Sequence, residues 1–205
     1  MSSKPKIYVV DDNEDWLDSL KFLFASVGLE VVTFNSGPEF LENYDTHEPG
    51  CLILDMRMPD MSGLQLQQAL AGKAKYLHTI FVSGHASVTT AVSAMKAGAV
   101  DFLEKPVDEQ VLLDRVQELF VQIEEERESR SRDQLIVDSL KQLTTREKEV
   151  LDLLIEGRQT RDIADRLAVS MRTIETHRAN ILAKTAFSSM GELLVAVKIL
   201  HKTTR

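Results

Sequence analysis

Five short apolar runs mark the first part of the chain: Ile7–Val10, Val31–Phe34, Cys51–Leu54, Thr79–Val82 and Val100–Leu103. Each run is four residues long, which is too short for a helix and fits a strand buried in a core. Because the runs are apolar nearly throughout rather than alternating, they indicate a parallel sheet that is covered on both faces.

Amphipathic stretches with helical spacing separate and follow these runs. They cover Asp15–Val27, Ser36–Leu41, Gly63–Ala71, Ser87–Ala97 and Glu109–Ile123. Five successive strand-then-helix units are typical of a doubly wound α/β fold. We therefore expect residues 1–123 to form one α/β domain.

The composition changes after Ile123, where the stretch EEERESRSRDQ (Glu124–Gln134) contains no apolar residue. Glu126 and Arg130 stand four positions apart, a spacing that stabilises a helix through their opposite charges. The same composition also suits a flexible linker. We expect residues 124–140 to be a charged, partly helical linker that extends the preceding helix and then frays.

From Leu143 onward the pattern is helical, with no strand signal. Thr144 and Glu147 have the spacing of a capping box, and Gly157 suits a helix end. The segments RQTRDIADRLAVS, SMRTIETHRANILAKT and MGELLVAVKIL follow. Residues 141–205 are thus predicted to form a small all-α domain of four short helices.

The charge is distributed unevenly along the chain. The net charge is −8, yet residues 1–124 hold 9 Lys and Arg against 19 Asp and Glu, whereas residues 158–205 hold 9 against 4. An acidic domain joined to a basic one is the asymmetry expected when only the second domain meets nucleic-acid phosphates.

The single cysteine, Cys51, has no partner for an internal disulfide. The first residues, MSSKPKIYVV, lack the apolar stretch of a signal peptide. No later segment approaches the roughly 20 apolar residues of a membrane span. We expect a cytoplasmic protein that does not bind membranes.

Polar residues stand where the predicted strands end. In a doubly wound sheet, ligands bind at the carboxyl ends of the strands, so these side chains should converge. Carboxylates at close range repel one another unless a hard cation lies between them, and oxygen ligands with water suit Mg²⁺, with Mn²⁺ as an alternative. The residues are Asp11, Asp12, Asp55, Ser83 and Lys105.

Chemistry then suggests a role for each of these groups. Asp55, alone on its strand, is the candidate nucleophile for a phosphoryl group. Asp11 and Asp12 would hold the metal, which neutralises charge on the transferred oxygens. Lys105 would add a point charge to the same oxygens, and Ser83 would donate a hydrogen bond to them.

Four motifs carry a resemblance to a known family: VVDDN, LILDMRMPDMSG, FVSGHA and VDFLEKP. Through them residues 5–123 resemble the receiver domain of two-component response regulators. The resemblance implies a five-stranded sheet of flavodoxin-like order and Mg²⁺-dependent phosphoryl transfer from a sensor histidine kinase to Asp55. It also implies metal contacts from Asp12, Asp55 and the backbone carbonyl of Arg57, with Asp11 acting through water.

The resemblance extends to the switch residues. Ser83 stands where Thr is common and keeps the hydroxyl. Phe102 stands in the place of an aromatic residue whose rotamer couples to that hydroxyl, although an ordinary core phenylalanine is the alternative. A receiver modifies its own aspartate, so we expect no enzyme activity beyond self-dephosphorylation.

The segment RDIADRLAVSMRTIETHRANI predicts two helices with a break around Ala168–Val169, and Ser170 suits the start of the second helix. One face of that helix, away from Ile174 and Ile181, should enter the major groove and touch base edges. That face carries Arg172, Glu175, Thr176 and Ala179. The residues placed to meet phosphates are Arg178, Lys184, Gln159 and Thr160.

Through LTTREKEVL and RTIETHRANILAK, residues 143–200 resemble the LuxR-type DNA-binding domain, and its FixJ-like branch most. Glu175 stands where many members carry Lys, and KTAFSSM departs from the usual pattern of that connection. His177 has no Cys or His at the spacing that a metal site would need. The resemblance implies a homodimer on an imperfect inverted repeat of double-stranded DNA, with RNA polymerase as a further partner.

The combination of a receiver-like domain with a DNA-binding-like domain predicts that phosphorylation shifts the population of the protein between two conformational states. Phosphorylation would move Ser83 and Phe102, reshape the face around the fourth helix and fifth strand, and permit dimerisation or release the second domain.

Two other functions compete with this one. A haloacid-dehalogenase-like phosphatase also uses Asp, Mg²⁺, Ser and Lys, but it needs an acid two residues after the nucleophile, and position 57 is Arg. Alternatively, the second domain binds RNA polymerase or RNA, which would show as salt-dependent binding without sequence preference.

Overall fold

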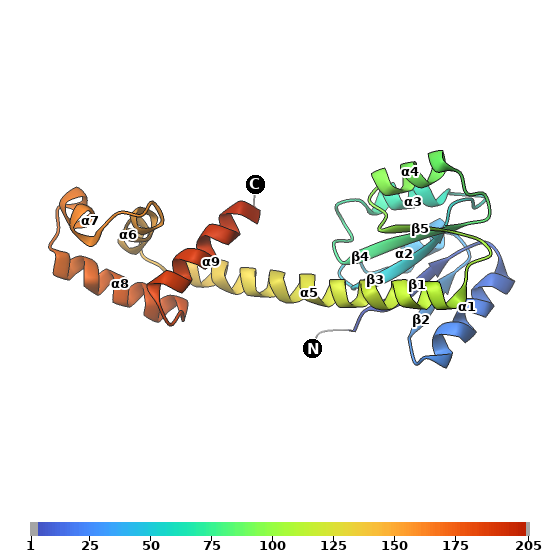
Figure 1. Ribbon diagram of the computed structural model, residues 1–205, viewed down its shortest axis with the longest axis horizontal. Coiled ribbons are helices and arrows are strands. Elements are labelled where there is room, and N and C mark those ends of the chain that lie inside the picture. Colours follow the sequence, from blue (N-terminus) through green and yellow to red (C-terminus); the bar gives the residue numbers. More distant parts are fainter. Residues whose placement is uncertain (1–3, 204–205) are drawn as a thin grey trace. The chain divides into compact units, whose positions relative to one another are not determined.

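The computed structural model describes residues 4–203, and the side chains of residues 4–200. The chain divides between Arg127 and Glu128 into two compact units. Each unit has a hydrophobic core of its own, and Figure 1 shows its elements.

The first unit is built on a parallel five-stranded sheet with the order β2-β1-β3-β4-β5. The strands are β1 (Lys6–Val10), β2 (Val31–Phe34), β3 (Gly50–Asp55), β4 (Leu77–Ser83) and β5 (Asp101–Glu104). The helices are α1 (Glu14–Ser26), α2 (Gly37–Asn43), α3 (Gly63–Leu70), α4 (Val88–Lys96) and α5 (Glu109–Lys141). This order is flavodoxin-like, so the predicted fold class is confirmed.

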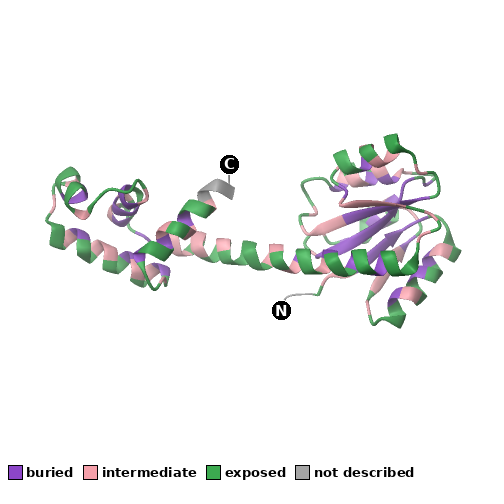
Figure 2. Ribbon diagram, viewed as in Figure 1, coloured by how far each residue is buried: buried purple, intermediate pink, exposed green. Residues whose placement is uncertain are grey.

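Helices cover both faces of the sheet, as the continuous apolar runs predicted (Figure 1). Alternate strand residues point to opposite faces. Tyr8 and Leu52 lie with α2, α3 and α4, while Ile7 and Ile53 lie with α1 and α5. Every residue of β3 is buried (Figure 2). This central strand is paired on both sides, and its residues lie in the cores on both faces of the sheet.

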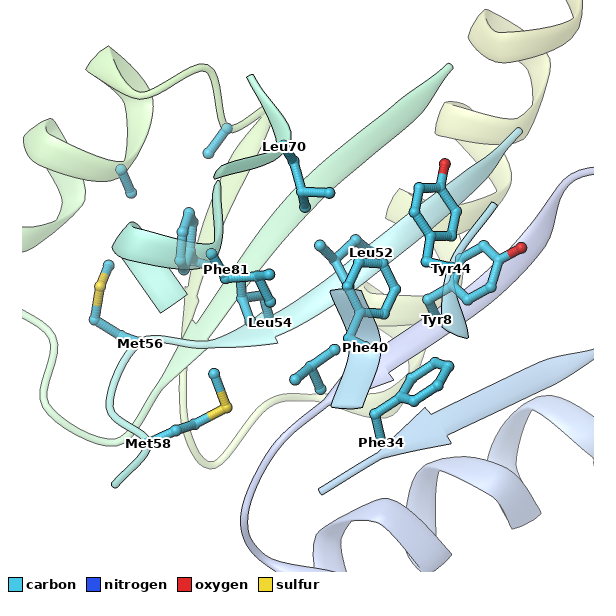
Figure 3. Packing of buried hydrophobic residues seen from close by; sticks show 14 residues of the cluster. Tyr8, Phe34, Phe40, Tyr44, Leu52, Leu54, Met56, Met58, Leu70 and Phe81 are labelled. Carbon is cyan, nitrogen blue, oxygen red and sulfur yellow. The ribbon is translucent and has the colours of Figure 1, made fainter. Parts of the chain in front are cut away.

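Aromatic rings fill much of the layer under α2, where Figure 3 shows their packing. The ring of Tyr8 meets those of Phe40 and Tyr44 edge-on, and Phe40 stacks on Tyr44. These arrangements are the favourable ones for aromatic pairs. The layer anchors β1 and β3, the two strands that lead into the candidate site.

Serine caps set the starts of three helices in this unit. The side chains of Ser36, Ser62 and Ser87 each accept a hydrogen bond from a backbone amide in the first turn of α2, α3 and α4. Such caps satisfy amides that have no partner inside the helix.

Helix α5 is continuous over 33 residues. Its first half buries Leu112, Val116 and Ile123 in the first unit, and Ile136 and Leu140 pack against the core of the second unit. The expected fraying within residues 124–140 is therefore wrong in the structure. Arg127 and Glu124, three residues apart, form an ion pair in the polar stretch, and Lys141 and Asp138 form another in the last turn of the helix.

The second unit contains α6 (Thr145–Ile155), α7 (Thr160–Leu167), α8 (Met171–Thr185) and α9 (Met190–Thr203), the four helices predicted. The capping box of Thr144 and Glu147 forms as its spacing predicted. The break between α7 and α8 lies at Ala168, which has a φ of 53°, and Ser170 caps α8. This left-handed residue turns the chain so that α8 crosses α7.

Within residues 4–203, no helix is long and apolar enough to cross a membrane.

Candidate phosphoacceptor and DNA-binding sites

The strand ends bring four predicted residues together at one edge of the sheet. Asp11 follows β1, Asp55 ends β3 and Ser83 ends β4, and these residues are 2%, 8% and 1% exposed. Lys105 follows β5, where its backbone amide donates to the carbonyl oxygen of Ser83 at 3.0 Å. The peptide bond between Lys105 and Pro106 is cis.

The Lys105 ammonium bridges the two buried carboxylates. Its Nζ atom lies 2.5 Å from Oδ2 of Asp11 and 3.0 Å from Oδ1 of Asp55. Burial raises the pKa of Asp11 and outweighs the hydrogen bonds from Lys105 and Asn13 that lower it. Burial lowers the pKa of Lys105, but its hydrogen bonds to Asp11 and Asp55 outweigh this, so the pKa is raised and the amine stays charged.

Backbone amides hold the remaining carboxylate oxygens. The amide of Arg57 donates to Oδ2 of Asp55 at 2.6 Å, and the amide of Asn13 donates to Oδ1 of Asp11 at 2.9 Å. Gly63, in the first turn of α3, passes so close to the backbone oxygen of Asp55 that a Cβ atom there would collide with it. The loop between β3 and α3 therefore fixes the Asp55 carboxylate in place.

The donor set suits Mg²⁺, although with fewer carboxylates than the sequence suggested. Asp12 is exposed, and among residues 4–200 no group of three His, Cys, Asp or Glu side chains is placed to hold a metal ion. Two carboxylates sharing one ammonium leave a negative charge, and Mg²⁺ commonly binds through one or two carboxylates with several waters. Asp11 and Asp55 thus fit the ion, and the role of the Arg57 carbonyl remains a prediction.

The predicted switch residues lie beside this cluster. The hydroxyl of Ser83 accepts a hydrogen bond from the amide of His85 at 3.3 Å. Phe102 lies in β5, is half-buried and packs against the core on the α2–α4 side of the sheet. Their movement on phosphorylation remains a prediction.

Trp16 is a site residue that the sequence analysis missed. The Lys105 Nζ atom lies over its ring, 5.1 Å from the centroid, at a distance typical of a cation–π contact. The indole Nε1 atom is buried and has no hydrogen-bond partner within the described part of the chain. A tryptophan in the first turn of α1, after two aspartates, was the available signal, but it also fits an ordinary apolar helix position.

The predicted base-reading face lies on the surface of α8. Its four residues, Arg172, Glu175, Thr176 and Ala179, are all exposed, while Ile174 and Ile181 of the same helix are buried. Gln159 is the N-cap of α7, and its side chain makes no capping hydrogen bond. The arrangement leaves one face of α8 and the start of α7 open to solvent.

The structure gives Lys184 a partner that the sequence did not suggest. Its Nζ atom lies 2.6 Å from Oε2 of Glu147, in the capping box of α6. The ammonium therefore joins α8 to α6 rather than standing free to meet a phosphate.

Arg178, Thr160 and Glu175 form a second connection, between α7 and α8. The NH1 atom of Arg178 donates to Thr160 Oγ1 at 3.0 Å and to Glu175 Oε1 at 3.2 Å, and Thr160 Oγ1 donates to Glu175 Oε1 at 3.2 Å. The three side chains belong to one hydrogen-bonded group.

Two family models match this chain in the order of its two units. The model described as response regulator receiver domain covers residues 7–117, more than half of the chain, and the model described as bacterial regulatory proteins, luxR family, covers residues 141–197. The chain is a member of the response-regulator family.

Relatives of this response regulator match it over both domains. The transcriptional regulatory protein TdiR of Thauera aromatica is 39% identical over 92% of this chain and 83% of its own length. The transcriptional regulatory protein FixJ of Bradyrhizobium diazoefficiens is 36% identical over 95% of each.

Solved structures agree with this assignment. The response regulator StyR covers 96% of this chain and 99% of its own, with 38% identity and a TM-score of 0.84. Full-length FixJ from B. japonicum covers 98% of each chain, with 34% identity and a TM-score of 0.60. The response regulator thus combines a receiver with a LuxR-type domain, the architecture of a transcription regulator, and this pairing implies a sensor kinase as partner and DNA as target.

Proposed function

We propose that Mg²⁺-dependent phosphorylation of Asp55 by a sensor histidine kinase controls dimerisation and sequence-specific DNA binding of this regulator. The observation that carries the proposal is the Lys105 ammonium bound to both Asp11 and Asp55 at the carboxyl edge of the sheet. It supplies a fixed positive charge beside the candidate phosphoacceptor, where charge develops during phosphoryl transfer.

In the proposed reaction, an oxygen of the Asp55 carboxylate attacks the phosphorus of a phosphohistidine. The phosphorus–nitrogen bond breaks, the imidazole leaves, and an aspartyl phosphate forms. Mg²⁺ supplies positive charge to the phosphoryl oxygens when bound, with Asp11, Asp12, Asp55 and the Arg57 carbonyl as the groups that would hold it or its waters. Lys105 pairs with a phosphoryl oxygen in place of the Asp55 oxygen that it contacts here.

We propose no separate substrate for this chain. Water would slowly attack the phosphorus of the aspartyl phosphate, releasing inorganic phosphate and restoring the carboxylate. The receiver thus acts as a timed switch rather than as an enzyme, and the fraction phosphorylated depends on both rates.

The switch operates by a shift of population between two states. The Ser83 hydroxyl would turn from its contact with the His85 amide to donate to a phosphoryl oxygen, and Phe102 would move with it. The altered surface around α4 and β5 then supports a dimer. Two copies of α8 on neighbouring major grooves would recognise an inverted repeat, with RNA polymerase as a further partner.

The test is sedimentation velocity with Mg²⁺ and acetyl phosphate, comparing wild type with Asp55→Asn and with the control Asp60→Asn, which changes an exposed carboxyl in the same loop. A donor-dependent dimer in wild type and Asp60→Asn alone supports the proposal. If mass spectrometry finds phosphate on Asp55 and no protein changes its sedimentation, the dimerisation part is wrong. Phosphate on another residue would contradict the assignment of Asp55.

A further inference from the structure

Glu175 lies on the predicted base-reading face of α8, yet its carboxylate bonds to other protein groups. Oε1 accepts from Arg178 at 3.2 Å and from Thr160 at 3.2 Å. We propose that Glu175 is a positioning residue that holds Arg178 and Thr160 as a phosphate-binding pair, and that it reads no base. This inference rests on the proposed DNA-binding function.

The geometry of the group supports this role. Arg178 NH1 also donates to Thr160 Oγ1, at 3.0 Å, so each of the three side chains bonds to the other two. A carboxylate oxygen has two acceptor positions, and both positions of Glu175 Oε1 are in use. The group also spans α7 and α8, so it fixes their side chains relative to each other.

The position of the group suits a phosphate. Thr160 is the first residue of α7, and the N-cap before it, Gln159, makes no side-chain capping bond. Free amides at a helix start attract anions, and a guanidinium binds phosphate through charge-assisted hydrogen bonds. Arg178 and the start of α7 thus face solvent from adjoining helices.

The two charged members of the group are exposed to different extents. The Arg178 side chain is 31% exposed and the Glu175 side chain is 58% exposed. An arginine already held by neighbours loses less side-chain freedom when it binds DNA than a free one does. The exposed carboxylate also offsets the arginine charge, which weakens attraction to phosphates that do not fit.

The other cation predicted to meet DNA, Lys184, is also paired with a glutamate. Lys184 is bound to Glu147, so each of these two cations has a glutamate partner. The Arg178 pair differs because its glutamate is exposed, whereas Glu147 is 4% exposed. Lys184 is therefore tied to a buried carboxylate, whereas both members of the Arg178–Glu175 pair are partly exposed at the surface.

The inference is tested with full-length, phosphorylated protein on duplexes selected by the wild type from a randomised pool. Affinity is then measured for single-base variants of the selected site with wild type, Glu175→Gln, Glu175→Ala, Arg178→Ala and the double variants Glu175→Ala/Arg178→Ala and Glu175→Gln/Arg178→Ala. The control is Glu149→Ala, which removes a glutamate from a comparable exposed pair with Arg146. Thermal melting establishes that each variant is folded.

A positioning role predicts that both Glu175 variants keep the wild-type base preference at every position, within about two-fold. Arg178→Ala should weaken binding to all duplexes alike and lower the salt slope by about one phosphate contact. Its effect should be clearly smaller in the Glu175→Ala background, because contacting side chains are coupled. Glu175→Gln, which keeps an acceptor oxygen, should retain the full effect of Arg178→Ala.

Two results would overturn the inference. Loss of preference at one base position, on the order of ten-fold, in both Glu175 variants would show that Glu175 reads a base. Additive effects at positions 175 and 178 would show that Glu175 does not position Arg178. If the wild type selects no sequence and binds all duplexes with the same salt dependence, sequence-specific DNA binding itself is wrong, and the inference fails with it.

Discussion

The ammonium of Lys184 in α8 lies 2.6 Å from the Oε2 atom of Glu147, a buried carboxylate in the first turn of α6. The same carboxylate oxygen accepts a hydrogen bond from the backbone amide of Thr144. A single carboxylate thus caps α6 and binds α8. The contact fixes the helix that carries the candidate DNA-reading face to the core of its domain.

Replacing Lys184 should destabilise the DNA-binding domain. Lys184→Met removes the cation and leaves the buried carboxylate without it, which should lower the free energy of unfolding by about 1–3 kcal/mol. Hydrogen exchange of the backbone amides in α6 and α8 measures the loss of stability in these two helices. The control is Lys141→Met, which breaks an exposed pair with Asp138 and should cost less than about 1 kcal/mol. Equal losses in both variants would contradict the structural role of Lys184.

The Lys184–Glu147 pair should also be sensitive to acid. Burial raises the pKa of Glu147, but the hydrogen bonds from Lys184 and Thr144 outweigh it and hold the pKa below its usual value. A lowered pKa in the folded state contributes stability above the ordinary glutamate pKa, and this is lost as pH falls through the folded value. The exchange difference between wild type and Lys184→Met should therefore shrink in that range. If the exchange difference between wild type and Lys184→Met stays constant as the pH falls through the folded-state pKa of Glu147, the ionic contact is contradicted.

Mg²⁺ should stabilise the receiver through Asp11 and Asp55. An ion that binds only the folded state adds about 2.7 kcal/mol at 100 times its dissociation constant. Hydrogen exchange in β1 and β3 should slow on addition of Mg²⁺ in wild type and in Asp60→Asn, and much less in Asp11→Asn and Asp55→Asn. The prediction fails if both site variants respond as the wild type does.

Without Mg²⁺, Asp11→Asn should stabilise the receiver at neutral pH. The pKa of Asp11 is raised by burial, so its contribution to stability is present below the ordinary aspartate pKa and lost as pH rises through the folded value. An amide carries no charge to bury. Urea unfolding at neutral and acidic pH should show the gain only at the higher pH, and a loss of stability at both would count against this account.

Trp16 should influence the rate at which Asp55 accepts a phosphoryl group. A cation–π contact is worth roughly 1 kcal/mol at a partly exposed site, so Trp16→Ala should slow phosphorylation by acetyl phosphate by about five-fold through loss of Lys105 orientation. The phosphorylation rate of Trp16→Phe should fall between the rates of wild type and Trp16→Ala. Phe22→Ala, on the exposed surface of α1, serves as the matched control. A rate unchanged in Trp16→Ala would remove Trp16 from the site.

The fold and the receiver site were largely predictable because both follow from local pattern. Four-residue apolar runs fixed the strands, and in a doubly wound sheet their ends must share one edge, so Asp11, Asp55, Ser83 and Lys105 could be brought together without a structure. The contact of Trp16 with Lys105 could not be predicted in this way. It joins α1 to the loop after β5, and no periodic signal marks which helix residue faces that loop.

Charged residues were the hardest to assign. Lys184 and Glu175 were placed by helical spacing alone, which tells which face a residue shares but not which neighbour satisfies its charge. The polar stretch of α5 was expected to fray because it lacks apolar residues. Its helix continues in the structure, since ion pairs three residues apart and apolar anchors on both sides, Ile123 and Ile136, support it.

The lone thiol of Cys51 offers an independent measure of receiver opening. It lies in β3, is fully buried, and has a pKa raised by that burial, so it is inert to thiol reagents while the sheet is intact. The rate at which a reagent labels it therefore reports how often the centre of the sheet is exposed. Because the chain contains no other cysteine, the labelling rate reports opening of the receiver domain alone and does not depend on unfolding of the DNA-binding domain.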